Sequence, residues 1–260
     1  MNCTICDSSE VKVLLADVSG AQIFLCNNCH NAFTWPKPQL PDYRTEDFQS
    51  KGKQDSTLTQ WHELPREILE SYAIQSALVE KYLPTGAEIL EIGGGEGIFL
   101  SMLRDKGYLV ELTEPSRTAA ARARERGLTV YNDYFQNVDL KKEYSLICLA
   151  HVLEHIDNPL RTLNALRILL KPGGFILLTQ TNFKGFMPVL RKKNWYAWVP
   201  DQHFFHFSIS GIKFLARKAG MEVMAYRYSR LVHGQSIYNS AIRFIPRLQD
   251  QFHVMLKINK

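Results

Sequence analysis

The sequence contains no long apolar segment. Nowhere do about 18 apolar residues follow one another, which excludes a membrane-spanning helix. The first residues, Met1 to Cys6, lack the basic and apolar regions of a secretory signal, so we expect a cytoplasmic protein. The chain also has no strong excess of one charge. Its formal net charge of +5 over 260 residues demands neither a nucleic-acid nor a membrane partner.

Cysteine is scarce, and four of the five cysteines stand in two Cys-x-x-Cys pairs. Cys3 and Cys6 form the first pair, Cys26 and Cys29 the second, with 19 residues between the pairs. This spacing is typical of a zinc site, because each short gap lets two thiolates reach one metal from a tight turn. Four thiolates leave no open coordination position, so the predicted zinc is structural. Reduced bystander thiols or a redox pair are the alternatives.

Apolar strands alternate with amphipathic helices after residue 87. The expected strands are 88–92, 108–113, about 128–131, 144–149 and 175–180, and the expected helices are 97–106, 116–126 and 159–170. This rhythm predicts an α/β fold with a doubly wound, mostly parallel sheet. A helix capped by Ser208 should reach Ala219, and two final strands, 221–228 and about 235–242, should close the sheet as a hairpin.

Three regions follow from these patterns. Residues 1–40 form a zinc-binding ribbon, with a hairpin across 11–15 and 22–25. Residues 41–87 form a linker or lid and then a helix over 65–82, and residues 88–260 form the main domain.

The segment Ile89-Leu90-Glu91-Ile92-Gly93-Gly94-Gly95-Glu96-Gly97 is the most informative in the chain. An apolar strand ends in an acid, and a glycine then falls at every second position (Gly93, Gly95 and Gly97). Glycine lets the chain turn sharply and brings backbone N–H groups against a ligand. The dinucleotide fingerprint does not fit, because its third glycine is missing. The pattern instead resembles the first motif of the Rossmann-like S-adenosylmethionine-dependent methyltransferases, which implies that Glu91 and these glycines bind that cofactor.

Further cofactor contacts are expected where later strands end, because ligands of open α/β sheets bind outside the carboxyl ends of the strands. Glu114 ends the second strand and can accept both ribose hydroxyls. The resemblance implies that Asp133 and Tyr134 contact the adenine. His151 follows the fourth strand and is placed to touch cofactor or substrate. No acid-or-Asn-Pro-Pro-aromatic motif follows that strand, which argues against methylation of base amines.

The cysteine pairs ahead of this fold resemble the bacterial deoxysugar C-methyltransferases. Residues 151–156, 200–208 and 233–237 are similar to segments of that family. The register places His155 on a family histidine and His203 on the presumed general base. That family continues into a further C-terminal domain, whereas this chain stops at Lys260, so we expect a shortened member.

The chain departs from the family motif next to the predicted base. Pro200, Asp201 and Gln202 replace its tyrosine, histidine and glutamate. The resemblance therefore implies the fold and the cofactor more strongly than carbon as the acceptor atom. We predict His203 as the general base, with His155 second and His206 as a further candidate.

A basic and aromatic segment over 191–198 has two interpretations. Its charges could hold a nucleotide diphosphate while Trp195 or Trp198 stacks on a ring. Alternatively, it is a solvated basic loop over an aromatic core patch.

These patterns favour a methyltransferase that uses S-adenosylmethionine and a structural Zn²⁺ and acts on a small molecule. We expect a sugar or sugar nucleotide, methylated on oxygen or carbon. One alternative is an RNA or protein methyltransferase that binds its polymer with the ribbon, although residues 1–34 contain Lys12 as their one lysine or arginine. Another is a non-catalytic protein that senses the cofactor. The oligomeric state is not predicted.

Overall fold

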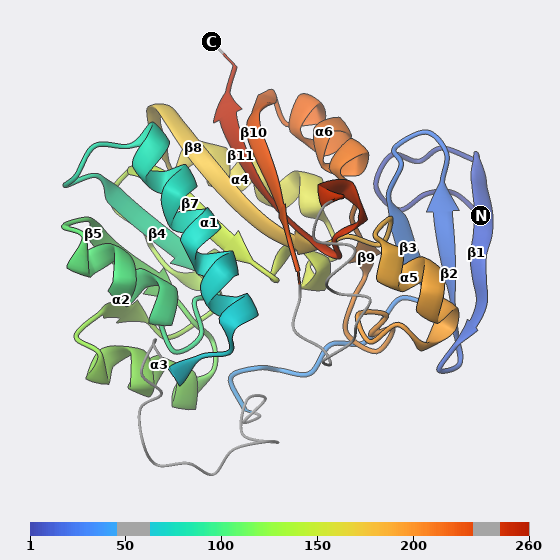
Figure 1. The fold of residues 1–260 in the computed structure, drawn as a ribbon, viewed down its shortest axis with the longest axis horizontal. Coiled ribbons are helices and arrows are strands. Elements are labelled where there is room, and N and C mark those ends of the chain that lie inside the picture. Colours follow the sequence, from blue (N-terminus) through green and yellow to red (C-terminus); the bar gives the residue numbers. More distant parts are fainter. Residues whose placement is uncertain (46–62, 231–244, 260) are drawn as a thin grey trace. The chain divides into compact units, whose positions relative to one another are not determined.

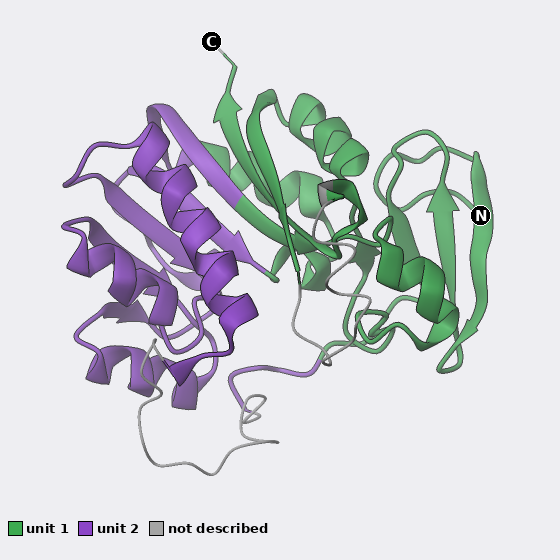
Figure 2. Cartoon of the chain, in the orientation of Figure 1, with its two compact units in different colours: residues 1–40, 151–167, 178–260 green, residues 41–150, 168–177 purple. Residues whose placement is uncertain are grey.

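The computed structural model describes residues 1–45, 63–230 and 245–259. The chain divides into two compact units (Figure 2). Unit 1 comprises residues 1–40, 151–167 and 178–260, and unit 2 comprises residues 41–150 and 168–177.

Unit 2 is built on a sheet with the strand order β8-β7-β4-β5-β6 (Figure 1). Its elements are α1 (Arg66–Tyr82), β4 (Glu88–Ile92), α2 (Ile98–Asp105), β5 (Leu109–Thr113), α3 (Arg117–Glu125), β6 (Thr129–Tyr131), β7 (Tyr144–Ala150) and the first part of β8 (Leu170–Thr181). β4 pairs in parallel with β5 and β7, and β5 pairs in parallel with β6. The predicted Rossmann-like fold with a mostly parallel sheet is confirmed.

The helices that follow β4 and β5 pack through small or apolar stripes. α2 packs against β5 and buries Phe99, Leu100 and Leu103, which share one face of the helix. α3 packs against β6 through buried alanines. Ser116 caps α3 by accepting a hydrogen bond from the Ala119 N–H at 3.4 Å. These contacts fix the two loops that lead from strand to helix.

β8 begins earlier than the sequence predicts. The sequence predicts a strand over 175–180, but the strand already starts at Leu170. Gly173 has a φ of 77° within it, so the Pro-Gly-Gly segment bends the strand. Lys171 pairs with Glu88 of β4 at 2.7 Å.

Unit 1 contains a four-stranded sheet and a strand hairpin. Its elements are β1 (Val11–Val18), β2 (Ala21–Cys26), β3 (Ala32–Trp35), α4 (Pro159–Ile168), the end of β8, α5 (Phe186–Arg191), β9 (Phe205–His206), α6 (Ile209–Lys218), β10 (Met221–Ser229) and β11 (Gln251–Ile258). The four-stranded sheet has the order β1-β2-β3-β9 and is antiparallel. The predicted hairpin of β1 and β2 and the Ser208 cap of α6 are both confirmed.

The structure contains a strand near the end of the described chain, β11, that the sequence does not predict. β10 pairs antiparallel with β11, whereas the predicted partner at 235–242 lies outside the described residues. β11 carries Gln251 and His253 in a buried run, and these polar residues weaken its apolar signal. His253 is satisfied in the core, because its two ring nitrogens lie 2.9 Å from the hydroxyls of Thr179 and Ser229.

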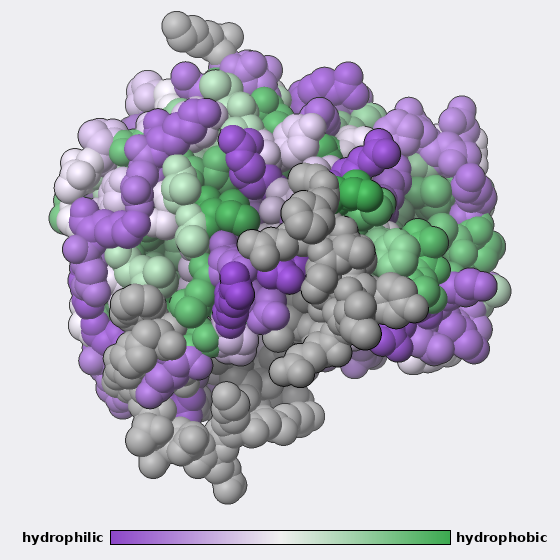
Figure 3. Space-filling model, viewed as in Figure 1, coloured by the Kyte–Doolittle hydropathy of each residue, from purple (hydrophilic) through white to green (hydrophobic). Residues whose placement is uncertain are grey.

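Apolar residues reach the surface on one part of unit 1. Figure 3 shows hydrophobic surface over the region of β1, β2 and α5. Val13 and Leu14 of β1 and Val189 and Leu190 of α5 are all exposed. Among the helices of the described chain, none is long and apolar enough to cross a bilayer.

Candidate functional site

The loop between β4 and α2 contains the predicted glycines. Gly93, Gly95 and Gly97 have positive φ angles of 64°, 57° and 71°, a region that residues with side chains rarely adopt. A Cβ atom on Gly97 would also lie 2.2 Å from Leu128 Cδ1. The positive φ of Gly97 and its close packing on Leu128, the residue before β6, together favour glycine at this position.

Glu114 is tied to this loop directly. Its Oε2 accepts a hydrogen bond from the Gly95 N–H and its Oε1 one from the Ser116 N–H, both at 2.8 Å. Burial raises the pKa of Glu114, and these two hydrogen bonds oppose the shift. Each oxygen keeps a lone pair. The carboxylate is thus held in place and can still accept hydroxyl donors from a ligand.

Glu91 lies near the end of β4, two residues before Gly93 of the same loop. Only 4% of the residue is exposed, and its Oε2 has no hydrogen-bond partner among the described residues. Burial, together with the charge of Glu114, raises the pKa of Glu91 to about 8. A buried carboxyl oxygen without a partner fits a ligand that supplies a hydrogen-bond donor or a positive charge.

Two arginines, one in α3 and one directly after it, bind Glu96 of the glycine loop. Arg122 pairs with the carboxylate of Glu96, and the Arg126 Nε–H donates to the Glu96 carbonyl oxygen at 2.9 Å. The alternating Arg and Ala residues of α3 suggest only an exposed face. The arginines pair with Glu96 only because the fold brings α3 next to the glycine loop, so the sequence alone does not reveal this pairing.

Asp133 and Tyr134, the predicted adenine contacts, lie against residues 42–44. The Tyr134 hydroxyl donates to Asp42 Oδ1 at 3.2 Å and accepts a hydrogen bond from the Tyr43 N–H at 2.9 Å. The Arg44 guanidinium stands 5.5 Å from the centre of the Tyr134 ring and 3.8 Å from Asp133 Oδ1. The segment that follows residue 40 is therefore fastened to the end of β6.

His151 directly follows β7 and has a strained backbone. Its φ is 55°, and its N–H donates to the Thr179 carbonyl at 3.0 Å. Its Nδ1 lies 3.4 Å from Glu154 Oε1, and 38% of its side chain is exposed. Backbone strain of this kind concentrates at functional sites.

Three side chains of unit 1 form what we call the histidine–glutamate cluster: Glu154, His155 and His203. One potential ligand atom from each lies within 4.8 Å of the others. Glu154 is 2% exposed, and neither of its carboxylate oxygens accepts a hydrogen bond within the described part of the chain. Burial alone would raise the pKa of Glu154, but the imidazoles of His151, His155 and His203 outweigh it and lower the pKa to about 2.

His203 is held from two sides. Its Nδ1 lies 3.2 Å from the Ala197 carbonyl oxygen, so this nitrogen carries the proton in the neutral ring. Its own carbonyl accepts a hydrogen bond from the Thr34 hydroxyl at 2.7 Å. Burial lowers the pKa of His203 to about 4. The ring is therefore neutral near pH 7, with Nε2 as the acceptor nitrogen.

His206 is placed for a structural role. Its Nε2 lies 3.1 Å from the Thr34 hydroxyl, and its ring packs edge-on against Trp198 at 4.6 Å between ring centres. Burial lowers its pKa well below the ordinary value. Thr34, which contacts both His203 and His206, was not predicted, because β3 lies more than a hundred residues before them.

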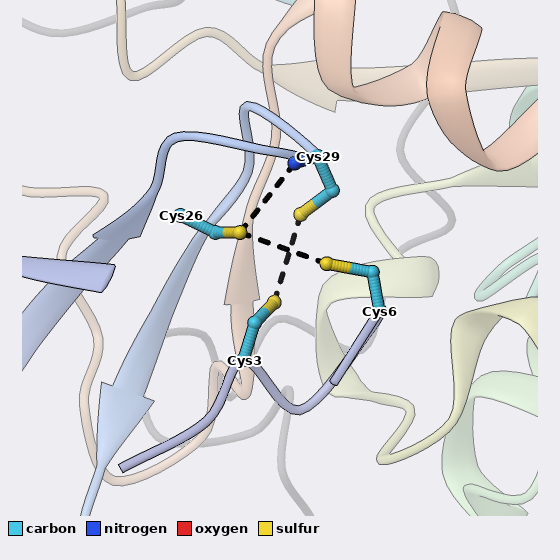
Figure 4. Close-up of side chains that lie close together, drawn as sticks. All are labelled: Cys3, Cys6, Cys26 and Cys29. Carbon is cyan, nitrogen blue, oxygen red and sulfur yellow. Dashed lines mark hydrogen bonds between the residues drawn. The ribbon is translucent and has the colours of Figure 1, made fainter. Parts of the chain in front are cut away.

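The four paired cysteines converge at one point (Figure 4). The sulfurs of Cys3 and Cys29 lie 3.6 Å apart, as do those of Cys6 and Cys26. Four sulfurs at about 2.3 Å from one zinc ion would lie about 3.8 Å from one another. These residues could therefore hold a tetrahedral metal ion. Cys148 is buried in β7 and is not one of this group.

The tryptophans of the 191–198 segment belong to a core. Trp195 and Trp198 are 1% and 7% exposed, and their rings meet edge-on at 5.0 Å. They pack in one cluster with Val18, Ile23 and Phe183. The structure thus supports the interpretation as an aromatic core patch, with exposed Arg191, Lys192 and Lys193 beside it.

Comparison with known proteins establishes the family. The model of the methyltransferase-domain family matches residues 60–226, so the chain belongs to this family. The ubiquinone biosynthesis O-methyltransferase of Haemophilus ducreyi is 29% identical over 119 residues, which are 40% of this chain and 50% of the relative. The protein of that name from Escherichia coli is 26% identical over 161 residues, 56% of this chain and 66% of the relative. The chain thus spans between half and two thirds of these curated relatives.

Solved structures support the same fold. A methyltransferase from Thermotoga maritima that uses S-adenosylmethionine aligns with a TM-score of 0.54 and 22% identity, over 76% of this chain and 99% of that one. The magnesium protoporphyrin IX methyltransferase from Synechocystis, solved with S-adenosylhomocysteine, aligns with a TM-score of 0.58 and 12% identity, over 79% and 90%. Identities this low show the fold alone. Family and fold together support S-adenosylmethionine as the cofactor, whereas membership of the deoxysugar C-methyltransferases stays a prediction.

Proposed function

We propose that this protein transfers a methyl group from S-adenosylmethionine to an oxygen or carbon of a small molecule, a sugar or sugar nucleotide. The observation that carries the proposal is the Glu114 carboxylate, fixed by the N–H of Gly95 in the loop where Gly93, Gly95 and Gly97 have positive φ. That loop joins a strand to a helix in a methyltransferase-family fold.

On the cofactor side, the bound group supplies an electrophilic methyl group. Glu114 accepts the ribose hydroxyls with the lone pairs that its amide bonds leave available. Glu91 Oε2 takes a hydrogen bond from the positively charged part of the cofactor, which offsets the cost of burying the carboxylate. Asp133 and Tyr134 hold the adenine.

On the acceptor side, methylation of a hydroxyl requires that a proton be removed. We infer that the histidine–glutamate cluster receives it, with His203 first and His155 second. The Ala197 carbonyl fixes the tautomer of His203 and leaves Nε2 as the proton acceptor. Correct alignment of donor and acceptor can supply roughly 7–11 kcal/mol of the barrier, and a positioned base contributes about 10²–10⁴-fold.

The names of the curated relatives and the few basic residues of the ribbon both support a small-molecule acceptor. The curated relatives carry names of small-molecule O-methyltransferases. The sugar assignment rests on the three segments around residues 151–156, 200–208 and 233–237. Residues 1–34 of the ribbon have Lys12 as their only lysine or arginine, which disfavours the alternative of RNA binding.

We further propose that the four cysteines bind one structural zinc ion. Backbone N–H groups already donate to their sulfurs, as metal-bound thiolates require: Ile5 to Cys3 and Cys29 to Cys26, each at 3.4 Å. The zinc would hold β1 to β3 together. Because β3 pairs with β9 through Ala32 and His206, it would also support the segment that carries His203.

The proposal is tested by incubating the protein with S-adenosylmethionine carrying a labelled methyl group. The acceptors are a panel of nucleoside-diphosphate sugars, free sugars and phenols. We expect label in a sugar nucleotide and loss of the transfer in Glu114→Ala, with Glu125→Ala, an exposed acid at the end of α3, as the matched control. Label in phenols alone would contradict the sugar assignment. Cofactor binding without transfer to any acceptor would favour a cofactor sensor.

A further inference from the structure

The histidine–glutamate cluster contains a buried carboxylate that accepts no hydrogen bond from the described residues. Both oxygens of Glu154 are buried without a hydrogen bond among the described residues. An unpaired buried carboxylate costs several kcal/mol. The His151 Nδ1, 3.4 Å from Glu154 Oε1, is an ion-pair partner of this carboxylate among the described residues, and a bound cation would satisfy its oxygens more fully.

The neighbours of Glu154 are arranged as metal ligands usually are. His203 directs Nδ1 at the Ala197 carbonyl, 3.2 Å away, and metal-binding histidines almost always donate their second ring nitrogen in this way. His203 Nε2 then carries a lone pair. The rings of His155 and His203 stand edge-on, with 4.7 Å between their centres and 84° between their planes.

The backbone holds the two halves of the cluster together. Glu154 and His155 lie in one short 3₁₀ turn, Leu153–His155, which begins two residues after the strained His151. The Phe204 N–H donates to the Glu154 carbonyl at 2.8 Å, which places His203 beside that turn. Thr34 fixes the His203 carbonyl from a third segment. The three side chains are therefore brought together by main-chain contacts.

We propose that Glu154, His155 and His203 bind a divalent first-row transition-metal ion, at a site distinct from the four cysteines. Two imidazoles and one carboxylate are the donor set that suits such ions and leaves coordination positions open. Bonds of about 2.0–2.2 Å would bring the donor atoms to about 3–3.5 Å from one another, so binding draws the three side chains together from their present limit of 4.8 Å.

The open positions suit a hydroxyl of the acceptor. This role depends on the proposed function, whereas metal binding itself does not. The hydroxyl oxygen coordinates the ion, and its O–H bond breaks with the proton passing to solvent. The oxygen then forms a bond to the methyl carbon while the C–S bond breaks, and its electron pair stays on sulfur. In this arrangement the Nε2 lone pair of His203 binds the ion and no longer accepts the proton, and the metal ion replaces His203 as the group that makes the proton easier to remove.

The test uses the zinc-loaded protein without methyl donor or acceptor, titrated with Co²⁺ and followed by calorimetry and visible absorption. We expect one Co²⁺ per chain beyond the zinc, with weak absorption bands and no thiolate charge-transfer band, because Co²⁺ does not displace zinc from four thiolates. Glu154→Gln should weaken this binding by at least about 100-fold, because losing a group that only hydrogen-bonds to a metal ligand already costs up to about 100-fold. Glu143→Gln, an exposed acid on unit 2, should leave it unchanged.

Folding of the variant is checked by its zinc content and its affinity for S-adenosylhomocysteine, which should match those of the wild type. Absence of a second metal ion in the wild-type protein would overturn the proposal. So would unchanged Co²⁺ binding in a folded Glu154→Gln variant, or a thiolate band that assigns the Co²⁺ to the cysteines. A protein that binds Co²⁺ at this cluster and methylates no sugar would retain the metal site and lose the proposed function.

Discussion

The glycine loop of unit 2 and the histidine–glutamate cluster of unit 1 are built from different parts of the chain. The loop is made of backbone: Gly93, Gly95 and Gly97 have positive φ, and the hydrogen bond from the loop to Glu114 comes from the main-chain N–H of Gly95. The cluster is made of side chains from two segments almost 50 residues apart in sequence, held by Thr34 from a third. A binding site made of backbone depends on local sequence, whereas a site made of side chains depends on distant contacts.

Burial shifts the pKa values of acidic and basic side chains in the two regions in opposite directions. It raises the pKa of Glu91 to about 8 and lowers that of His203 to about 4. The cause is the same, because a low-dielectric interior disfavours the charged form of either group. The carboxyl of Glu91 can therefore respond to a positive ligand, while the imidazole of His203 is a neutral acceptor at physiological pH.

The largest expected effect comes from removing the zinc ion, which should disrupt the fold of unit 1 and leave cofactor binding by unit 2 unchanged. Structural zinc sites contribute on the order of 10 kcal/mol to the folding of their domains. Removing the metal with a chelator, or Cys26→Ser, should unfold β1 to β3 and abolish turnover, because β9 loses its partner strand. The affinity for S-adenosylhomocysteine should change by less than about twofold, since the glycine loop belongs to the other unit.

Thermal unfolding and calorimetry measure these two results. Cys148→Ala serves as the control, because this buried cysteine lies outside the group of four sulfurs. A metal-free protein that melts as before and keeps its turnover would refute the structural role of zinc.

The second effect concerns the cluster alone. His203→Ala should lower kcat by roughly 10²–10⁴, with an unchanged melting temperature. Because the pKa of His203 is about 4, its ring is neutral above about pH 5. Activity that depends on the neutral ring should therefore decline only below that pH. Steady-state rates between pH 4 and 9 check both expectations.

His30→Asn provides the matched control, since this histidine is exposed and its φ of 61° is one that asparagine tolerates. Full activity of His203→Ala would transfer the role to His155 or show that alignment alone suffices. A fall in cofactor affinity and melting temperature together would mean that His203 only supports the fold.

The same contrast explains what could be predicted from the sequence. The strands and helices of unit 2, the glycine loop and the paired cysteines follow from periodicity and spacing over short ranges. Glu154 looks like an ordinary solvated acid in the sequence, because its burial depends on residues 203–204. Thr34 and β11 were missed for related reasons: the partners of Thr34 lie far away along the chain, and β11 buries polar residues.

The central claim is that cofactor binding belongs to the glycine loop and the acceptor chemistry to the histidine–glutamate cluster. Calorimetric titration of S-adenosylhomocysteine into the wild type, Glu114→Ala and His203→Ala tests it most directly. The account predicts that Glu114→Ala loses about 1.5–3 kcal/mol of binding free energy, the worth of hydrogen bonds to a charged group, and that His203→Ala binds as the wild type does. Equal losses in both variants, or wild-type affinity in Glu114→Ala, would contradict it.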